Sequence, residues 1–495
     1  MRVLLVYPEF PDTFWSFKHA LKFVSKKASF PPLGLLTVAA MLPEEWEKRL
    51  IDMNVTPLTQ RDLEWADYVM ISAMIIQRQS VQQVIERCRA VGVPMIAGGP
   101  LFTDEPEKYP DVDHLVLNEA ELTLPLFVRD LAAGKAQHIY TTTEFPSLET
   151  TPVPLWHLAD LRQYASMPIQ YSRGCPFNCD FCNITALFGH KPRTKTAAQI
   201  IAELDSLYAQ GWRSEVFFVD DNFIGNRRQL KDEILPALRA WGAREKGFSF
   251  ETEVSINLAD DDELVKAMVD AGFDTVFIGI ETPDEDSLAE CSKSQNRGRD
   301  LTSCVKKLQK AGLQVQGGFI VGFDSDTPSI FQRQIDFIQK SGIVAAMVGV
   351  LQAPRGTRLY ERMQREGRLL HDCTGDNTEG ALNFIPRMDK DTLLQGYYRI
   401  VKTIYSPDFY YQRVKTFLRE YNPSQFKRSI SLTDVAALAR SIYHLGIRGV
   451  ERAQYWRLFF WTLFRRPKVF PLAIALSIYG FHFRTVFESQ AGSMS

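Results

Sequence analysis

Three cysteines stand close together in the middle of the chain. Cys175, Cys179 and Cys182 have the spacing Cys-x3-Cys-x2-Cys. Three thiolates at this spacing can ligate three irons of one 4Fe–4S cluster, which leaves the fourth iron without a protein ligand. The alternative is zinc, but a structural zinc ion normally takes four ligands. The sequence has no fourth Cys or His at short spacing, since His190 comes eight residues after Cys182. We therefore predict an iron–sulfur cluster.

The elements around this motif indicate an α/β fold. Strand-like runs alternate with helical patterns, and this alternation predicts parallel sheets covered by helices. The Cys loop directly follows a strand-like run, so we expect it at the C-terminal mouth of a barrel, where β/α barrels place their active sites. The strand-like runs lie at residues 3–7, 50–55, 68–74, 94–97, 114–117, 168–172, 215–219, 249–254, 275–280, 314–320 and 345–351.

These patterns divide the chain into four parts. Residues 1–145 read as a doubly wound, Rossmann-like domain, and residues 146–164 as a Pro- and Thr-rich extended linker. Residues 165–360 carry six βα units, which predict a partial (β/α)6 barrel or an open curved sheet. Residues 361–495 are mostly helical in pattern and rich in aromatic residues and Arg.

Composition and charge narrow the classes of function. The net charge is −2 with mixed signs, so no broad surface for nucleic acid is indicated. Seven Cys in 495 residues, with only three clustered, do not form a disulfide framework and indicate a reducing compartment. The chain opens on a strand-like run and not on a signal peptide, so we expect a cytoplasmic protein.

The Cys loop, with the aromatic Phe181 before its last Cys, resembles the signature of the radical S-adenosylmethionine (SAM) superfamily. The whole chain resembles radical SAM proteins with an N-terminal cobalamin-binding domain. The subgroup that it resembles contains the hopanoid C-2 methylase and the archaeal tetraether-lipid ring synthases. This resemblance rests on the segments 169–175, 217–226, 277–283 and 318–324, and on the helical C-terminal region.

The resemblance implies that SAM is reductively cleaved at the cluster, and it assigns SAM-binding residues to strand ends. Asp220 and Asp221 end the second barrel strand, where the family places the acidic partner of the SAM amino group; helix capping by Asp221 is the alternative. Glu253 shares a face with Ser255 on the third strand, unless that face is a surface-facing edge. The full set of SAM-binding predictions is Phe181, Asp220, Asp221, Glu253, Ser255, Glu281 and Gly318.

The resemblance also implies cobalamin, although one common feature is missing. Many cobalamin proteins have an Asp-x-His-x-x-Gly loop, whereas the first strand here is followed by residues 7–12 without His. Binding would rest on the crevice loops at the strand ends, and the alternative is a domain that keeps the fold without the cofactor. The residues predicted for cobalamin are Pro32, Gly34, Ser72, Ala73, Gly98, Gly99, Pro100 and Glu119.

From this resemblance we predict a cobalamin-dependent methyltransferase that acts on an unactivated carbon of a hydrophobic lipid or isoprenoid substrate. An electron donor such as flavodoxin or ferredoxin would reduce the cluster. Two alternatives stay open: a radical SAM enzyme that cyclises or couples lipid chains without methyl transfer, and an iron–sulfur scaffold without catalysis.

The C-terminal region suggests contact with a membrane. Residues 456–464 and 469–483 are apolar stretches separated by Arg465-Arg466-Pro467-Lys468. Basic residues and Trp beside a short apolar helix are typical of a membrane interface. The second stretch falls short of the ~20 residues that a spanning helix needs. We therefore expect peripheral contact with the cytoplasmic membrane face, with a helical cap on the barrel as the alternative.

Overall fold

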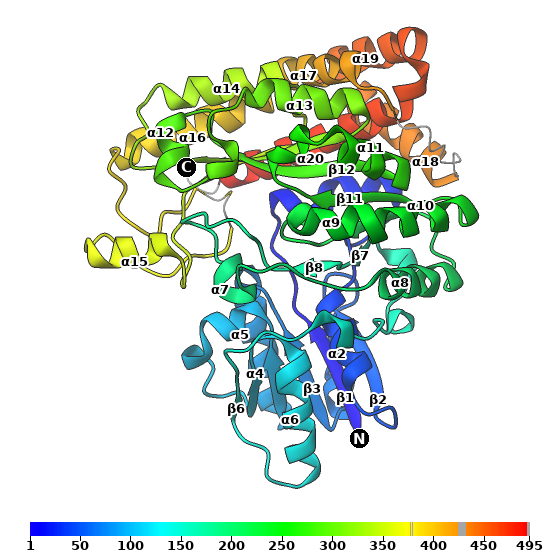
Figure 1. Cartoon of the computed structure of the whole chain (residues 1–495), viewed down its shortest axis with the longest axis vertical. Helices are drawn as coiled ribbons and strands as arrows, with labels where there is room; N and C mark the ends of the chain where they lie inside the picture. Colours follow the sequence, from blue (N-terminus) through cyan, green and yellow to red (C-terminus); the bar gives the residue numbers. More distant parts are fainter. Residues whose placement is uncertain (377, 379, 424–431, 493–495) are drawn as a thin grey trace.

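A computed structural model describes residues 1–423 except 377 and 379, and residues 432–492. Three regions follow one another along the long axis of the molecule (Figure 1). The N-terminal sheet and its helices occupy one end, a second sheet lies in the middle, and C-terminal helices cover the far side of that second sheet (Figure 1). The predicted α/β class, with two parallel sheets and a helical C-terminal region, is confirmed.

The N-terminal sheet is parallel, in the order β2-β1-β3-β4-β5-β6. Helices α4 (Arg78–Val91) and α5 (Pro100–Asp104) cover one face, and α2 (Leu33–Met41) and α6 (Ala120–Ala132) cover the other. The order 2-1-3-4-5 is that of flavodoxin-like doubly wound domains, which bind ligands at the carboxyl ends of their strands. The strands are β1 (Arg2–Tyr7), β2 (Glu47–Asp52), β3 (Tyr68–Ser72), β4 (Met95–Gly98), β5 (His114–Val116) and β6 (Ile139–Tyr140).

The second sheet has six parallel strands in the order β14-β13-β12-β11-β10-β7, so each βα unit adds one neighbouring strand. Such an open run of βα units is the predicted partial barrel. Its strands are β7 (Met167–Ile169), β10 (Glu215–Phe218), β11 (Ser249–Glu253), β12 (Phe273–Glu281), β13 (Gln314–Val321) and β14 (Ala346–Val350). Its outer helices are α8 (Ala197–Ala209), α10 (Leu235–Arg244), α11 (Asp262–Ala271), α13 (Leu301–Ala311) and α14 (Ile330–Ser341).

The segment after β1 reaches the inner side of the barrel. Trp15 donates a hydrogen bond from Nε1 to Met347 Sδ on β14 at 2.9 Å, and its ring packs edge-on against Phe277 of β12. Phe14 stacks on Phe483 of α20 (Phe470–Gly492) with ring centroids 4.1 Å apart. The inner side of the barrel is therefore covered by residues from both ends of the chain, an arrangement that hydrophobic periodicity alone does not predict.

The C-terminal helices are α16 (Lys390–Ile404), α17 (Pro407–Glu420), α18 (Leu432–Ser441), α19 (Arg452–Arg465) and α20. By length and composition, Pro467–Ser489 is apolar enough to cross a membrane, yet 56% of its most apolar window is buried inside the protein. Helix α20 packs on α1 (Lys18–Leu21), α17 and α19. Much of this helix is therefore packed within the protein, as in the alternative of a helical cap, and contact of residues 469–483 with a membrane stays a prediction.

The connector at residues 146–164 is packed and not free. It forms short 3-10 turns at Leu148–Thr150, Trp156–Leu158 and Leu161–Gln163. Trp156 is fully buried and belongs to the core shared with the barrel. The extended linker suggested by its Pro and Thr content is thus replaced by a segment that ties the two sheets together.

Candidate active site

The Cys loop runs from β8 (Ser172–Arg173) to α7 (Ile184–Phe188) at the mouth of the barrel. Gly174 begins this loop with φ +93°, and a Cβ there would lie within about 3 Å of the carbonyl oxygens of Phe188, Gly189 and Lys191. Only glycine tolerates both the left-handed backbone and this close approach. The backbone N–H of Cys175 donates to Gly189 O at 3.3 Å, which folds the loop back on its own end.

The three predicted ligands lie in one loop and supply the donor types that a cluster needs. Cys175, Cys179 and Cys182 are all free and partly exposed, and each lies close enough to influence the ionisation of another. Burial raises the pKa of the Cys182 thiol to about 12, so this side chain becomes a thiolate only with a metal beside it. A set of three thiols without a neighbouring His is the donor set of a cubane with one open iron.

A second loop, after β12, also reaches the Cys loop. Gln295 donates from Nε2 to Cys179 Sγ at 3.7 Å. Lys293 Nζ forms an ion pair with Glu281 Oε1 at 2.6 Å and lies 5.9 Å from the Phe181 ring centroid. Burial lowers the pKa of Lys293, but the charges of Glu281 and the Cys thiolates raise it well above its ordinary value overall, so the lysine is cationic beside the cluster position. No motif in the sequence pointed to Lys293 or Gln295.

Asp220 holds the backbone that leads into the Cys loop. Its buried carboxylate accepts hydrogen bonds from Ser172 Oγ at 2.6 Å, from the Tyr171 N–H at 3.2 Å and from the Ser172 N–H. Burial raises the pKa of Asp220 to about 7. The predicted contact with the SAM amino group is not supported for Asp220, because protein donors already occupy this side chain.

The carboxylates of Asp221 and Glu253 accept fewer hydrogen bonds from the described residues than the carboxylate of Asp220 does. Asp221 Oδ2 accepts from the Gly174 N–H at 3.2 Å, and burial raises its pKa to about 6. Glu253 lines a cavity of about 200 Å³ together with Trp15 and Phe277. Burial raises the pKa of Glu253 to about 8, and no partner for its carboxylate is found among the residues that the structure describes. Glu253 is thus the predicted SAM residue that is most available to a ligand.

The remaining SAM predictions have protein partners of their own. Ser255 Oγ donates to Asn257 Oδ1 at 2.7 Å. Glu281 ends β12 with φ +63°, and its carboxylate is held by Lys293. A Cβ on Gly318 would lie 2.9 Å from Phe277 Cζ, so glycine is needed there for packing inside the barrel. Contact of these three residues with SAM stays a prediction.

The loops predicted for cobalamin meet at the carboxyl edge of the N-terminal sheet. Gly99 has φ +90°, and a Cβ there would lie 2.6 Å from Ser72 Oγ and 3.3 Å from Ala73 O, so the loops after β3 and β4 touch. Gly34 has open space beside it, and Met74 exposes half of its side chain at the same edge. Small residues beside an exposed apolar side chain fit a large flat cofactor. Pro32 directly precedes α2 and Pro100 begins α5. A Cβ on Gly98 would meet Val116 O.

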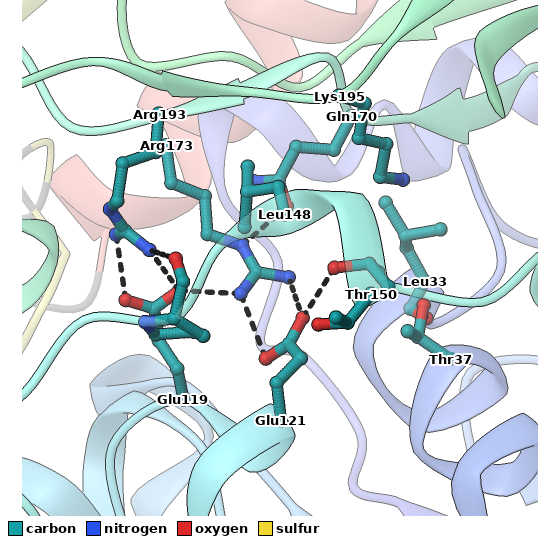
Figure 2. A network of polar contacts seen from close by, with 12 residues as sticks. Leu33, Thr37, Glu119, Glu121, Leu148, Thr150, Gln170, Arg173, Arg193 and Lys195 are labelled. Atoms are coloured by element: carbon teal, nitrogen blue, oxygen red, sulfur yellow. Dashed lines mark hydrogen bonds and ion pairs between the residues drawn. The ribbon is translucent and has the colours of Figure 1, made fainter. Parts of the chain in front are cut away.

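Glu119 has a different role from the predicted one. Its two carboxylate oxygens pair with Arg193 Nη2 at 2.7 Å and Arg173 Nη1 at 2.6 Å (Figure 2). Glu121, in the first turn of α6, pairs with Arg173 Nη2 at 3.0 Å. Figure 2 shows the two carboxylates rising from the N-terminal domain to meet the two guanidinium groups of the β8–β9 hairpin, in which β9 is Arg193–Thr194. The prediction that Glu119 binds cobalamin is therefore not supported, because it connects the two domains.

Comparison with known proteins agrees with this architecture. Residues 169–338 match the radical SAM superfamily, residues 24–128 match the B12 binding domain, and residues 357–494 match a domain of unknown function, DUF4070. An uncharacterized methyltransferase of Synechocystis sp. is 42% identical and covers 98% of this chain and 91% of its own length. The hopanoid C-2 methylase of Rhodopseudomonas palustris is 35% identical and covers 92% of this chain and 88% of its own length.

Solved structures share the fold. The cobalamin-dependent SAM radical enzyme OxsB covers 100% of this chain and 80% of its own, with a TM-score of 0.61 and 13% identity. The radical SAM methyltransferase TsrM from Kitasatospora setae covers 74% of this chain and 76% of its own, with a TM-score of 0.57 and 15% identity.

The chain belongs to the cobalamin-dependent radical SAM methyltransferases, the family that includes the hopanoid C-2 methylase. The predictions of a 4Fe–4S cluster, of SAM and of cobalamin are thereby confirmed, and the zinc and scaffold alternatives fall away. Relatives named as methyltransferases favour methyl transfer over cyclisation or coupling.

Proposed function

We propose that this enzyme methylates a carbon atom of a hydrophobic small molecule of the lipid or isoprenoid class. The observation that carries the proposal is the lining of the cavity at the barrel mouth. Trp15, Phe277 and Met347 give it apolar walls. Two carboxyl groups, those of Glu253 and Asp376, line the same cavity. Apolar walls with few polar groups select ligands by shape and by burial of apolar surface.

Similarity to the hopanoid C-2 methylase supports the same class of substrate. That relative covers nearly the whole of this chain, including the C-terminal region that follows the barrel. A methylase that is named for a hopanoid acts on a polycyclic, apolar molecule. A related substrate would bury its apolar surface against the cavity walls formed by Trp15, Phe277 and Met347.

The residues of this chain would bind and orient the reactants. Cys175, Cys179 and Cys182 would hold the cluster, and the loops around Gly34 and Gly99 would hold cobalamin. When bound, the cluster supplies the electron for SAM cleavage and cobalamin supplies the methyl group. Radical chemistry also requires that water and competing hydrogen donors be kept away from the reacting atoms. The walls of the cavity, which come from several separate parts of the chain, suit this task.

The electron donor and the location complete the proposal. The cluster has to be reduced before each SAM cleavage, so a small electron-transfer protein such as flavodoxin or ferredoxin is the expected partner. All seven cysteines are free, in keeping with a reducing cytoplasm. A hydrophobic substrate would further favour a position at the cytoplasmic membrane face.

Deletion of the gene followed by mass spectrometry of extracted lipids tests the substrate class. We expect loss of a lipid species that is heavier by one CH2 group than a species that accumulates. An unchanged lipid and pigment profile would contradict the lipid class. Cyclisation would appear instead as the loss of a species with two fewer hydrogens and the same number of carbons. Coupling of two molecules would appear as the loss of a species with the summed mass of both less two hydrogens, and either result would contradict methyl transfer.

A further inference from the structure

Helix α19 and the segment before it expose large apolar side chains to solvent. Val450 is 79% exposed and Phe464 is 77% exposed, far above what burial in a core would give. A few isolated apolar residues on a surface are ordinary, whereas a group of them marks an interaction site. We call this group the outer C-terminal face; it consists of Tyr443, Ile447, Val450, Phe460, Leu463 and Phe464.

The aromatic side chains of α19 form one stripe of this face. Trp456 donates from Nε1 to Gly446 O at 2.9 Å, which joins α19 to the preceding turn. The Trp456 ring stacks on Phe460 with centroids 5.5 Å apart, and Phe460 stacks on Phe464 at 6.3 Å. Residues four apart along a helix lie on the same side, so 456, 460 and 464 follow one stripe of α19. The face therefore runs from the turn near Ile447 along the whole of α19.

The exposed charges of residues 442–468 are positive, and an acidic contact to α19 from outside this segment is made by Asp408, which accepts from Gln454 Nε2 at 2.7 Å. Residues 442–468, all described by the structure, contain five Arg, one Lys and a single acidic residue, Glu451. Glu451 is 1% exposed and pairs with Arg484 at 2.6 Å, so it contributes no charge to the surface. Arg457 and Arg465 are exposed on α19 among the aromatic residues. The chain as a whole has a net charge of −2, so this concentration of positive charge is local.

We propose that the outer C-terminal face docks on a lipid surface that contains anionic headgroups. Aromatic residues would enter the boundary between headgroups and acyl chains, while arginines extend their apolar stems and pair with phosphates. The long apolar helix α20 is inside the protein, so this contact lies on the membrane and does not span it. Docking on lipid does not depend on which substrate the enzyme takes, because none of the residues of this face lines the cavity.

A second copy of the chain fits this face less well. In a two-fold contact the same patch meets itself. Arg457 and Arg465 of one copy would then approach the same residues of the other, and no acidic residue of this face would neutralise them. Like charges at an interface are unfavourable, and charged residues are depleted from interface cores. A surface of anionic lipid satisfies both the apolar and the basic side chains.

Vesicle sedimentation with the full-length protein tests the proposal. Vesicles of phosphatidylcholine alone are compared with vesicles of phosphatidylcholine and phosphatidylglycerol. We expect binding to the anionic vesicles that weakens as salt is raised. Combined Phe460→Ser and Phe464→Ser should lower the partition coefficient on the order of tenfold or more, because two aromatic side chains no longer enter the bilayer. Combined Arg457→Gln and Arg465→Gln should remove most of the preference for anionic lipid.

Two matched variants serve as controls. Leu126→Ser removes a side chain of α6 that is 43% exposed, and Arg228→Gln removes a charge that is 93% exposed; both should bind vesicles as the wild type does. The proposal is overturned if wild-type protein ignores anionic vesicles, or if the Phe460 and Phe464 variant binds as well as Leu126→Ser. It is also overturned if sedimentation velocity shows a wild-type dimer that this variant converts to monomer, since the face would then join two copies.

Discussion

Glu119 and Arg193 form a buried ion pair between the two cofactor-binding domains, with Oε1 and Nη2 2.7 Å apart. Glu119 lies directly before α6 in the N-terminal domain, and Arg193 belongs to the β8–β9 hairpin beside the Cys loop (Figure 2). Only 3% of the Glu119 side chain and 15% of the Arg193 side chain are exposed. Because Arg173 and Glu121 extend the same network, the position of the B12-binding domain is coupled to the loop that holds the cluster.

Replacing Glu119 by Ala should destabilise the protein and leave cobalamin binding in place. The change leaves Arg193 buried without a carboxylate, and removal of one partner of a buried pair costs about 3–5 kcal/mol. Denaturant unfolding of the reduced protein measures this loss. Titration with hydroxocobalamin measures cobalamin binding. A loss of cobalamin affinity in a variant that remains folded would show that Glu119 contributes to the cofactor site. Glu121→Gln is the matched control within the network, and its cost should be smaller because Glu119 still pairs with Arg173.

Each cluster cysteine should be needed for iron and for SAM cleavage. Cys175→Ala, Cys179→Ala and Cys182→Ala remove one of three iron ligands each, so the reconstituted variants should contain little iron and form no 5′-deoxyadenosine. Cys291→Ala is the matched control. The Cys291 thiol is buried, and the backbone carbonyl of this residue accepts a hydrogen bond from the N–H of Asp180 in the Cys loop. Iron and sulfide analysis of anaerobic protein gives the measurement. A full cluster in any of the three single variants would contradict the assignment.

Sequence patterns were sufficient for the architecture, and they predict cluster ligands that lie within one loop. The strands of both sheets are short apolar runs in regular alternation with helices, and this pattern is local in the chain. The ligands Cys175, Cys179 and Cys182 lie within one loop, so their spacing alone defines the site. Placement at the barrel mouth followed from the strand before the loop, because active sites of β/α barrels lie at the carboxyl ends of the strands.

Contacts between distant segments could not be read from the sequence. Glu119 and Arg193 are 74 residues apart, and Trp15 and Met347 are 332 residues apart. Neither pair has a periodic or motif signal, since only the packing of the domains brings it together. The packing of helix α20 could not be predicted for a related reason: an apolar stretch is compatible with a membrane surface and with a protein interior, and composition does not separate the two.

The hydrogen bond from Gln295 to Cys179 Sγ should raise the reduction potential of the cluster. Donors to cluster sulfurs stabilise the more negative, reduced form, and Gln295 is 7% exposed, so water does not replace it easily. Gln295→Leu should therefore lower the midpoint potential in a titration followed by electron paramagnetic resonance. Ser294→Ala, an exposed neighbour in the same loop, should leave the potential unchanged. Equal potentials in the wild type and the Gln295 variant would show that this contact does not tune the cluster.

SAM binding and the stability of the folded protein should both depend on pH through ionisation of the Glu253 carboxyl. Burial raises the pKa of its carboxyl to about 8, so the group is neutral at pH 7 and loses its proton as pH rises through about 8. Glu253→Gln should thus bind SAM like the wild type at pH 7, because a neutral acid and an amide both donate and accept hydrogen bonds. The two proteins should diverge above pH 8, where only the wild type ionises. Glu253→Ala should weaken binding on the order of tenfold through loss of one hydrogen bond.

The same shift predicts the pH dependence of unfolding for Glu253. An ordinary glutamate has a pKa of about 4.5 in the unfolded chain, below the folded value. Between about pH 4.5 and about pH 8 the folded protein therefore binds more protons than the unfolded one at this site, and stability falls as pH rises through that window. Replacement by Gln should flatten this decline in denaturant unfolding measured from pH 5 to pH 9. Parallel curves for the wild type and the Gln variant would place the carboxyl in contact with bulk water, outside the cavity that Trp15 and Phe277 enclose.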